Sequence, residues 1–402
     1  MPSKVYPYYP PKLIHKINKS LKSGKVNYWT GNEGVLFEKE FSKYVGNRYS
    51  IAVSNGSVAL EMALKALDLK KNDEIIVTPR SFIISASCVL NLGLKPKFAD
   101  VDKNGNLSIN GIKNSYTKKV KAIILVHLNG LPCDLDPIIN FTKKLKIKII
   151  EDCSQAHGAV YKNKPVGSFG DISTWSFCQD KIISTGGEGG MISTDNKKFW
   201  KKCWSLKDHG KNYYSVFHKK HKLGFKWLHD SIGSNHRMTE IQAIIGRYQL
   251  KYLDSQIKKR NQIAKKVMRS LRIFWNKYNL ILQPNFNCSG CKLNDLKKDC
   301  NNCIHSFYRL NFYVNIDRRK KLKLLNYLQK NNVNCNEGPC PEIYKEKLFK
   351  RLKIYPSVKL TNASQLGKKS IAYHINPFIT SNKLDRDIKL LRQNLFKCIK
   401  IF

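Results

Sequence analysis

The feature that most constrains the fold of this chain is a series of short apolar runs, rich in Val and Ile, separated by amphipathic segments. Runs of this kind are typical of strands that are buried on both faces of a mostly parallel sheet. They lie at 75–79, 121–127, 146–152, 173–177 and 189–194. The segment 57–67 places Leu60, Ala63, Leu64 and Leu67 on one side of a helix, so it should pack on that sheet. We therefore expect an α/β fold.

The pattern changes near residue 255. Charged helical segments follow, then a polar stretch with clustered cysteines, and then SFYRLNFYVNI (306–316), which predicts a strand in a second sheet. A chain of 402 residues with 42% hydrophobic content can bury a large core and form more than one domain. We predict a large domain over 1–255 and a smaller C-terminal α+β domain over 256–402.

The composition is strongly basic, because 72 Lys and Arg residues against 29 Asp and Glu residues give a formal net charge of +43. Such an excess can indicate a polyanionic partner. Here the lysines are spread along the chain, and no nucleic-acid-binding fold or aromatic stripe accompanies them. We therefore do not expect a nucleic-acid partner, although a basic surface would attract a nucleotide diphosphate.

No stretch approaches the roughly 18 uninterrupted apolar residues that a membrane span needs. The N-terminal sequence MPSKVYPYYPPKL also lacks the apolar core of a signal peptide. From these two observations we expect no membrane association and a cytoplasmic location.

Two ionisable residues in the middle of the chain indicate chemistry. Asp152 ends an apolar run, so its carboxylate should lie at the carboxyl edge of a strand, where open α/β sheets present ligand-binding groups. Lys181 follows the next strand-like run and precedes a glycine-rich turn at 186–190. Such a lysine can form an imine, and a nearby aspartate can keep a pyridine nitrogen protonated. Taken singly, the alternatives are a helix cap for Asp152 and a solvated charge for Lys181.

The sequence SNGSVALEMAL (54–64) predicts a phosphate site, because Gly56 and Ser57 open the amphipathic helix. Free N–H groups and the helix dipole favour an anion at a helix N-terminus, and the Ser57 hydroxyl could add a bond. The alternative is that Ser57 simply caps the helix.

Together these segments resemble the DegT/DnrJ/EryC1/StrS family of sugar aminotransferases, which have the aspartate aminotransferase (type I) fold. The similarity runs from about Asn27 to Thr380 through NYWTGNEGVLFEKEFSKYVG, AVSNGSVAL, EDCSQAHGA, GSFGDISTWSF, KIISTGGEGGM and NHRMTEIQAIIGRYQLKYLD. The resemblance implies a large domain with a mostly parallel mixed sheet flanked by helices, pyridoxal 5'-phosphate as cofactor, and a homodimer with shared active sites.

By position in these motifs, the resemblance implies that Lys181 forms the Schiff base with the cofactor and moves the proton during transamination. Asp152 would pair with the pyridine nitrogen, and Gln155 would contact the ring hydroxyl. The other implied cofactor contacts are the phosphate-binding Gly56, Ser57 and Ser176, the ring-stacking Phe82, and Asn235 from the neighbouring subunit. Phe82 could instead be an ordinary core residue, and His157 could orient Asp152 or be structural.

The resemblance further implies transfer of an amino group from glutamate to a keto sugar carried by a nucleotide, for surface polysaccharide or modified-sugar biosynthesis. Alternatives are a sugar dehydratase or an aromatic-amine-forming enzyme of the same fold, or a non-catalytic regulatory or nucleic-acid-associated relative. Dehydratases of the family carry His in place of Lys181. Asp180 stands where many relatives have Thr, and His236 replaces a frequent Tyr; neither change removes a required role.

Four cysteines form a separate motif in an insert at 288–303: Cys288, Cys291, Cys300 and Cys303. Two CxxC pairs on a short polar segment suit the tetrahedral thiolate coordination of a structural zinc ion. An iron–sulfur cluster or uncoordinated thiols are the alternatives. The resemblance does not require this insert, and we expect no catalytic role for it.

Overall fold

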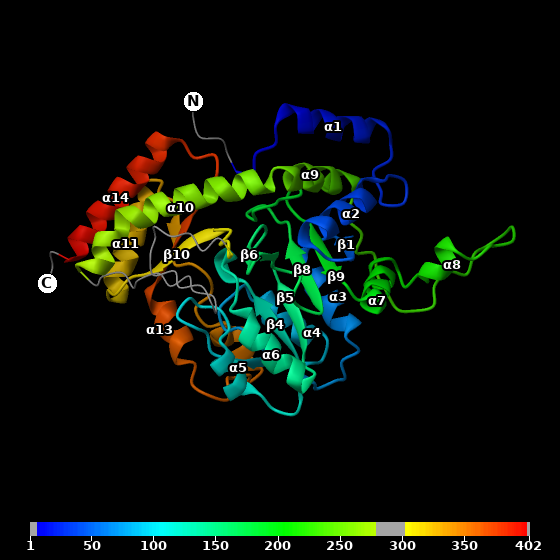
Figure 1. Cartoon of the computed structure of the whole chain (residues 1–402), viewed down its shortest axis with the longest axis horizontal. Helices are drawn as coiled ribbons and strands as arrows, with labels where there is room; N and C mark the ends of the chain where they lie inside the picture. Colours follow the sequence, from blue (N-terminus) through cyan, green and yellow to red (C-terminus); the bar gives the residue numbers. More distant parts are fainter. Residues whose placement is uncertain (1–5, 279–301, 400–402) are drawn as a thin grey trace.

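The structure is a computed structural model, and it describes residues 6–278 and 302–399. Figure 1 shows a large sheet with its helices on one side of the molecule and a small sheet on the other, with a long helical segment running along both.

Up to residue 278 the elements are α1 (Pro11–Lys22), α2 (Glu33–Val45), β1 (Tyr49–Val53), α3 (Gly56–Ala66), β2 (Glu74–Val77), α4 (Ile84–Asn91), β3 (Lys95–Phe98), α5 (Ile109–Ser115), β4 (Val120–Val126), η1 (Leu128–Gly130), α6 (Leu135–Leu145), β5 (Lys148–Asp152), β6 (Val160–Tyr161), β7 (Lys164–Pro165), β8 (Ile172–Ser176), β9 (Gly190–Thr194), α7 (Lys197–Lys207), α8 (Tyr213–Phe217), α9 (Glu240–Lys251) and α10 (Leu253–Asn276). From residue 302 onward they are β10 (Arg309–Tyr313), α11 (Arg318–Lys330), β11 (Cys335–Asn336), η2 (Ile343–Lys345), α12 (Lys347–Arg351), α13 (Thr361–Lys369), β12 (Ser370–His374) and α14 (Ser381–Ile399).

The main sheet has seven strands in the order β1-β9-β8-β5-β4-β2-β3. Neighbouring strands from β8 to β3 are parallel, whereas β9 is antiparallel to both β1 and β8. The five strands predicted from apolar runs are confirmed as β2, β4, β5, β8 and β9. Strands β1 and β3 were not predicted from the sequence; β3 is KPKF, an edge strand with too few apolar residues to show the pattern.

Helices cover both faces of this sheet, which explains why its strands are apolar throughout. In β4, Ile123 and Leu125 face a core shared with α2, α5, α6 and α9, while Ile124 and Val126 face a core shared with α3, α4 and α7. The predicted amphipathic helix is α3, and its Leu60 and Leu64 are buried in the second of these cores.

A three-stranded antiparallel sheet, β10-β12-β11, forms the smaller body with α10, α11 and α14 packed around its core. The predicted strand within 306–316 is β10. Along α10, Ile257 packs in the core of the large sheet and Ile263 in that of the small sheet. The buried residues between 343 and 366 pack in the core around α3 and α4, so this segment after residue 255 contacts the large body.

Of the predicted zinc ligands, Cys288, Cys291 and Cys300 lie outside the described residues. The Cys303 thiol accepts a hydrogen bond from the Lys162 N–H (3.3 Å), and its neighbour Ile304 pairs with β6. The zinc hypothesis therefore stays a prediction.

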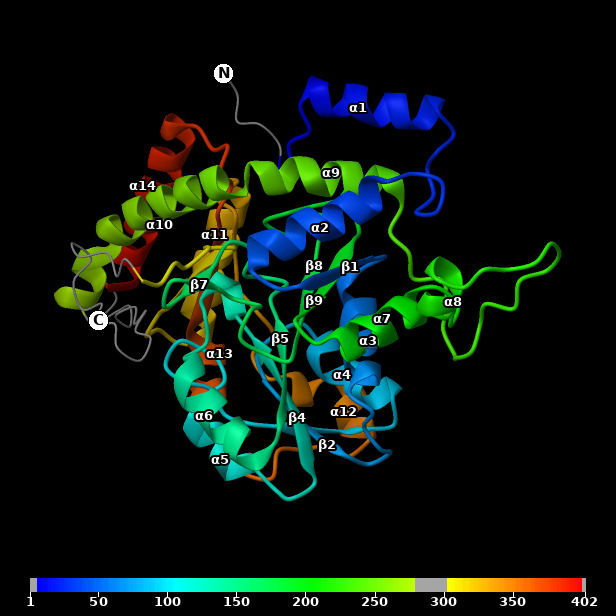
Figure 2. The same cartoon turned by 45° about the vertical axis from the view of Figure 1, so that its right-hand side comes forward.

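Beyond α7, α8 and the loop after it extend away from both bodies in the two views of Figures 1 and 2. This loop carries large apolar side chains in solvent, including Leu223 (106% exposed), Trp227 (86%) and Ile232 (92%). Across residues 6–278 and 302–399, no helix is both long and apolar enough to cross a membrane.

Candidate active site

The carboxyl edge of the parallel strands holds Asp152 as predicted, because Asp152 is the last residue of β5. The side chain is almost fully buried, and its carboxylate accepts hydrogen bonds from the Ser85 hydroxyl (3.3 Å) and the Ser154 N–H (3.1 Å). Ser85 lies in the first turn of α4, and its N–H bonds the Phe82 carbonyl (3.2 Å). One short segment therefore connects Phe82 to Asp152.

Phe82 is 69% exposed, so its alternative interpretation as a core residue is wrong. Gln155 is held in the loop after β5, where its side-chain oxygen accepts the Asn129 N–H at 2.8 Å. His157 is fully buried, with its ring 5.4 Å from the Trp175 ring and 5.6 Å from the Phe177 ring. Burial and the charge of Lys181 lower the pKa of His157 to about 3, so its imidazole is neutral.

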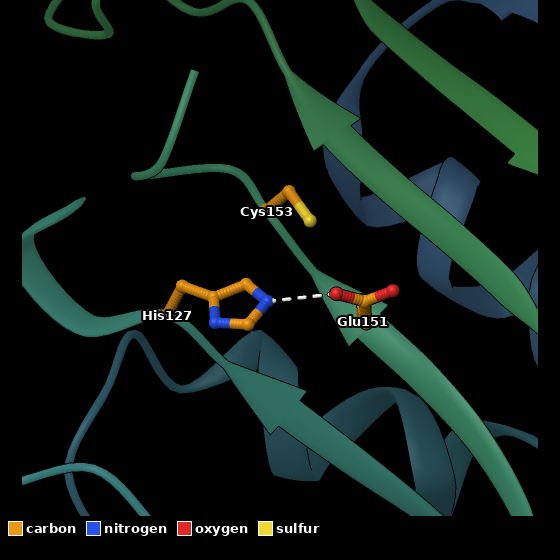
Figure 3. Close-up of side chains that lie close together, drawn as sticks. All are labelled: His127, Glu151 and Cys153. Carbon is orange, nitrogen blue, oxygen red and sulfur yellow. Dashed lines mark hydrogen bonds and ion pairs between the residues drawn. The ribbon is translucent and has the colours of Figure 1, made fainter. Parts of the chain in front are cut away.

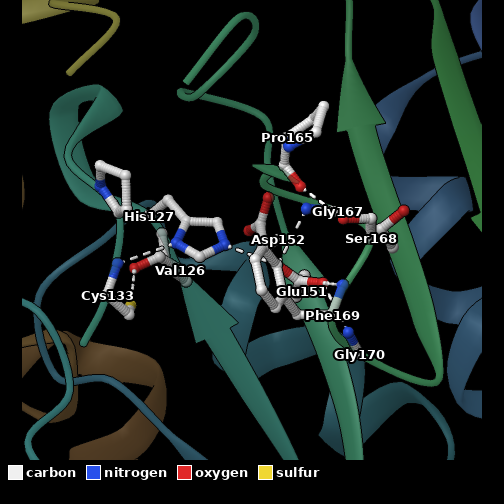
Figure 4. Close-up of polar contacts among 12 residues, drawn as sticks. Val126, His127, Cys133, Glu151, Asp152, Pro165, Gly167, Ser168, Phe169 and Gly170 are labelled. Carbon is white, nitrogen blue, oxygen red and sulfur yellow. Dashed lines mark hydrogen bonds and ion pairs between the residues drawn. The ribbon is translucent and has the colours of Figure 1, made fainter. Parts of the chain in front are cut away.

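Glu151, next to Asp152, is the buried anion that fixes this edge of the sheet, as Figure 4 shows. Its carboxylate accepts the N–H groups of Gly167 (2.9 Å), Phe169 (2.8 Å) and Gly170 (2.6 Å), and the His127 Nε2 (3.0 Å). The Cys133 N–H donates to His127 Nδ1 (3.0 Å), which places the ring proton on Nε2. Burial alone would raise the pKa of Glu151, but these donors outweigh it and lower the pKa.

Among the described residues, the group whose atoms lie close enough to hold a metal ion is His127, Glu151 and Cys153 (Figure 3). Both imidazole nitrogens of His127 are already hydrogen-bonded, and each Glu151 oxygen already accepts two hydrogen bonds. Burial also raises the pKa of the Cys153 thiol well above its usual range, which disfavours the thiolate that metals bind. His127 and Glu151 therefore belong to a structural hydrogen-bond network, with the neutral Cys153 thiol beside it.

The segment predicted to bind a phosphate also lies at the sheet edge. α3 begins at Gly56, and its N-cap is Asn55, whose side chain accepts the Val58 N–H at 2.9 Å; the alternative that Ser57 caps this helix is therefore wrong. The first N–H groups of a helix have no partner within it. Gly56 lies against Ser176 at the end of β8, so closely that a Cβ on Gly56 would be 2.6 Å from the Ser176 Cβ.

Lys181 follows β8 in a mostly buried position. Its Nζ lies 2.9 Å from Asp180 Oδ1 and 3.2 Å from the Tyr308 hydroxyl, which in turn donates to Asp180. Burial alone would lower the pKa of Lys181, but Tyr308 and Asp180 stabilise the ammonium and raise it. Arg309 also pairs with Asp180 at 3.1 Å. The small sheet thus contributes two side chains that the sequence analysis misses.

Asn235 is exposed, and it bridges to Asp208 in a loop whose backbone lies beside the start of α3, since the Ser54 N–H donates to the His236 carbonyl (2.9 Å). Asp208 stabilises this loop, because its carboxylate forms ion pairs with Lys211 (3.2 Å) and Arg237 (2.5 Å). The backbone of the Asn235 loop therefore lies beside the start of α3, while Asn235 itself is exposed.

The fold and this arrangement of lysine, aspartate and helix N-terminus define the class as type I-fold aminotransferases. A solved aminotransferase from Psychrobacter cryohalolentis superposes with a TM-score of 0.92 at 38% identity, covering 99% of this chain and 100% of that one. The chain belongs to the DegT/DnrJ/EryC1/StrS aminotransferase family, whose profile matches residues 10–392.

Two curated relatives extend the comparison. GDP-perosamine synthase of Escherichia coli O157:H7 is 38% identical over 265 residues, which cover 65% of this chain and 70% of that protein. The uncharacterized protein MJ1066 of Methanocaldococcus jannaschii is 31% identical over 374 residues, which cover 92% of this chain and 91% of that protein.

Replacing Glu151 with Gln should lower the free energy of unfolding by about 3 kcal/mol, because the buried N–H donors lose their anion. Urea denaturation at neutral pH measures this, with the exposed Glu188→Gln as control. The folded-state pKa of Glu151 lies below its ordinary value of 4.5, so the stabilisation is present above that pH and is lost as the pH falls through the folded-state pKa. The difference between wild type and variant should shrink on acidification; a constant difference would contradict the role of the charge.

Proposed function

We propose that this aminotransferase uses pyridoxal phosphate to transfer an amino group from glutamate to a keto sugar carried by a nucleotide, in polysaccharide or modified-sugar biosynthesis. The observation that carries the proposal is the position of Lys181 beyond β8, with Asp152 at the adjoining strand end. The relative named GDP-perosamine synthase supports a nucleotide sugar as the substrate class. The lysine favours amine transfer over the dehydratase alternative.

The described residues fit this cofactor. Asp152 is a buried carboxylate suited to a protonated pyridine nitrogen, and the exposed Phe82 ring lies one helical turn before Ser85, which bonds Asp152. The start of α3 and Ser176 form a narrow cradle suited to a phosphate, since only a residue without a Cβ fits at Gly56. When bound, pyridoxal phosphate supplies an aldehyde that takes up amines and a ring that withdraws electrons.

The chain's own residues would then orient the cofactor and move protons. Asp152 would stabilise a proton on the ring nitrogen, because its carboxylate is buried and its hydrogen-bond donors, Ser85 and Ser154, are neutral. Lys181 Nζ would move the proton between the substrate carbon and the cofactor carbon to which the amine is attached. Its resting charge is set by Asp180 and Tyr308, which favour the ammonium, so the amine must give up a proton before it acts as a base.

The first prediction concerns Lys181→Ala. Wild-type protein with pyridoxal phosphate should show a visible absorption band that shifts to shorter wavelength when glutamate is added, and the variant should show neither that band nor the shift, because it lacks the reacting amine. The exposed Lys164→Ala is the matched control and should behave like wild type. A wild-type protein without the band, even with excess cofactor, would refute the proposal.

The second prediction concerns the phosphate cradle. Gly56→Ala should weaken pyridoxal phosphate binding at least about tenfold, roughly 1.4 kcal/mol, because the new methyl group collides with Ser176 at the helix N-terminus. Gly246→Ala is a matched control, since its Cβ would lie 2.5 Å from the Phe37 ring, where α9 packs against α2. That variant should lose stability and keep its cofactor affinity, both measured by titration and thermal unfolding. Equal affinities of Gly56→Ala and wild type would contradict the cradle.

We also propose that the protein is a homodimer, with Asn235 reaching the phosphate in the partner subunit. The support is the exposed apolar loop that precedes Asn235, since large apolar patches on a surface mark interaction sites. Leu223→Ser with Trp227→Ser should increase the monomer fraction in sedimentation experiments, whereas Leu145→Ser, which alters an apolar residue exposed elsewhere, should not. A wild-type protein that sediments as a monomer would refute the homodimer.

A further inference from the structure

The segment before α1 lies directly on the backbone of the loop that carries Lys181. The Tyr6 hydroxyl bonds the Lys181 carbonyl oxygen, 175 positions away in sequence, and the Ile182 carbonyl oxygen at 2.8 Å. Three residues on, the Tyr9 hydroxyl lies 3.2 Å from the Ser184 Oγ. Tyr6 and Tyr9 both precede residue 10, where the match to the family begins.

Tyr6 is only partly exposed, and its hydroxyl points at the backbone of the Lys181 loop. Burial raises the pKa of Tyr6, so the hydroxyl keeps its single proton, which it shares between the two carbonyl oxygens. The Arg260 guanidinium lies over the Tyr6 ring, 5.2 Å from its centroid. Its positive charge is attracted to the electron-rich face of the ring. Arg260 is buried as well.

Arg260 connects this contact to the other side of Lys181. Its guanidinium donates to the carbonyl oxygens of Phe307 (3.2 Å) and Ile375 (2.9 Å) on the small sheet. Phe307 precedes Tyr308, whose hydroxyl accepts a hydrogen bond from Lys181 Nζ. The backbone end of Lys181 is therefore held by Tyr6 and its ammonium end by Tyr308, with Arg260 between the two supports.

We propose that Tyr6 is a positioning residue for Lys181: by holding the Lys181 and Ile182 carbonyls, it fixes the direction in which the lysine side chain leaves the backbone. Small displacements of a reacting group cost rate, because reaction requires close and aligned approach. The inference rests on the proposed role of Lys181, although the backbone contact itself can be tested without the cofactor.

The test is Tyr6→Phe, which removes one oxygen and keeps the ring that lies against Arg260. Tyr9→Phe is the matched control, because it removes a different hydroxyl of the same segment and leaves the Lys181 carbonyl bonded. In cofactor-free protein, hydrogen–deuterium exchange of the peptide containing Lys181 to Ser184 should be about fivefold faster in Tyr6→Phe than in wild type or Tyr9→Phe.

In protein loaded with pyridoxal phosphate, the rate constant for the glutamate-induced change of the cofactor absorption band should fall about tenfold in Tyr6→Phe, because the base is misdirected. The half-saturating glutamate concentration should stay within about twofold of wild type, because no substrate contact is removed. A purely structural role would instead lower thermal stability and leave the rate constant unchanged.

Two results would overturn the assignment: unchanged exchange and unchanged rate in Tyr6→Phe, or equal effects of Tyr6→Phe and Tyr9→Phe, which would show that only docking of the segment matters. If wild-type protein gives no cofactor band, the proposed function fails, and the exchange experiment still decides whether Tyr6 holds the Lys181 backbone.

Discussion

The organisation of the active-site edge depends on the burial of one negative charge. Glu151 has no contact with solvent, yet its carboxylate accepts four hydrogen bonds, three from one loop and one from His127. The backbone N–H groups at 167–170 come from the loop before β8, and His127 comes from the end of β4. A buried carboxylate with fewer donors would be strongly destabilising. The charge therefore dictates where two neighbouring segments end relative to β5.

That constraint determines the geometry available to Asp152, the next residue. Side chains alternate across a strand, so a fixed Glu151 on one face directs Asp152 to the other. Asp152 then needs only two weaker contacts, from Ser85 and Ser154, to hold its orientation. Lys181 is fixed differently, by Asp180, by the N-terminal Tyr6 and by Tyr308 at the start of the small sheet. The aspartate is thus set by the sheet itself, and the lysine by long-range contacts.

Much of this could be predicted from sequence, and the reason is local. The apolar runs predicted five strands, the spacing of Leu60 and Leu64 predicted α3, and Asp152 fell at a strand end because the apolar run stopped there. The edge strand β3 lacks that signal, since a strand with one exposed edge needs fewer apolar residues. The sequence left Ser57 with two possible roles, phosphate binding or capping of α3. It could not show that Asn55, an equally good cap, takes the second role.

The contacts missed by sequence analysis are those between segments far apart in the chain. Nothing in the residues around Tyr6, Tyr308 or Arg309 indicates that they meet at Lys181. Glu151 gave a weak signal, an acid inside an apolar run, but its partners at 167–170 carry no side-chain pattern, because they donate through backbone N–H groups. Periodicity and motifs report local structure, whereas these contacts depend on how distant segments pack.

The edge strand β3 has a consequence for how molecules of this protein can associate. Its sequence KPKF presents a proline, which has no N–H to donate, between Lys95 and Lys97. A second strand approaching this edge would find an interrupted row of donors and would have to bury lysine charge. The sheet therefore cannot grow outward from β3, and stacking of copies into sheet-extended fibres is blocked on this side even when the protein is concentrated.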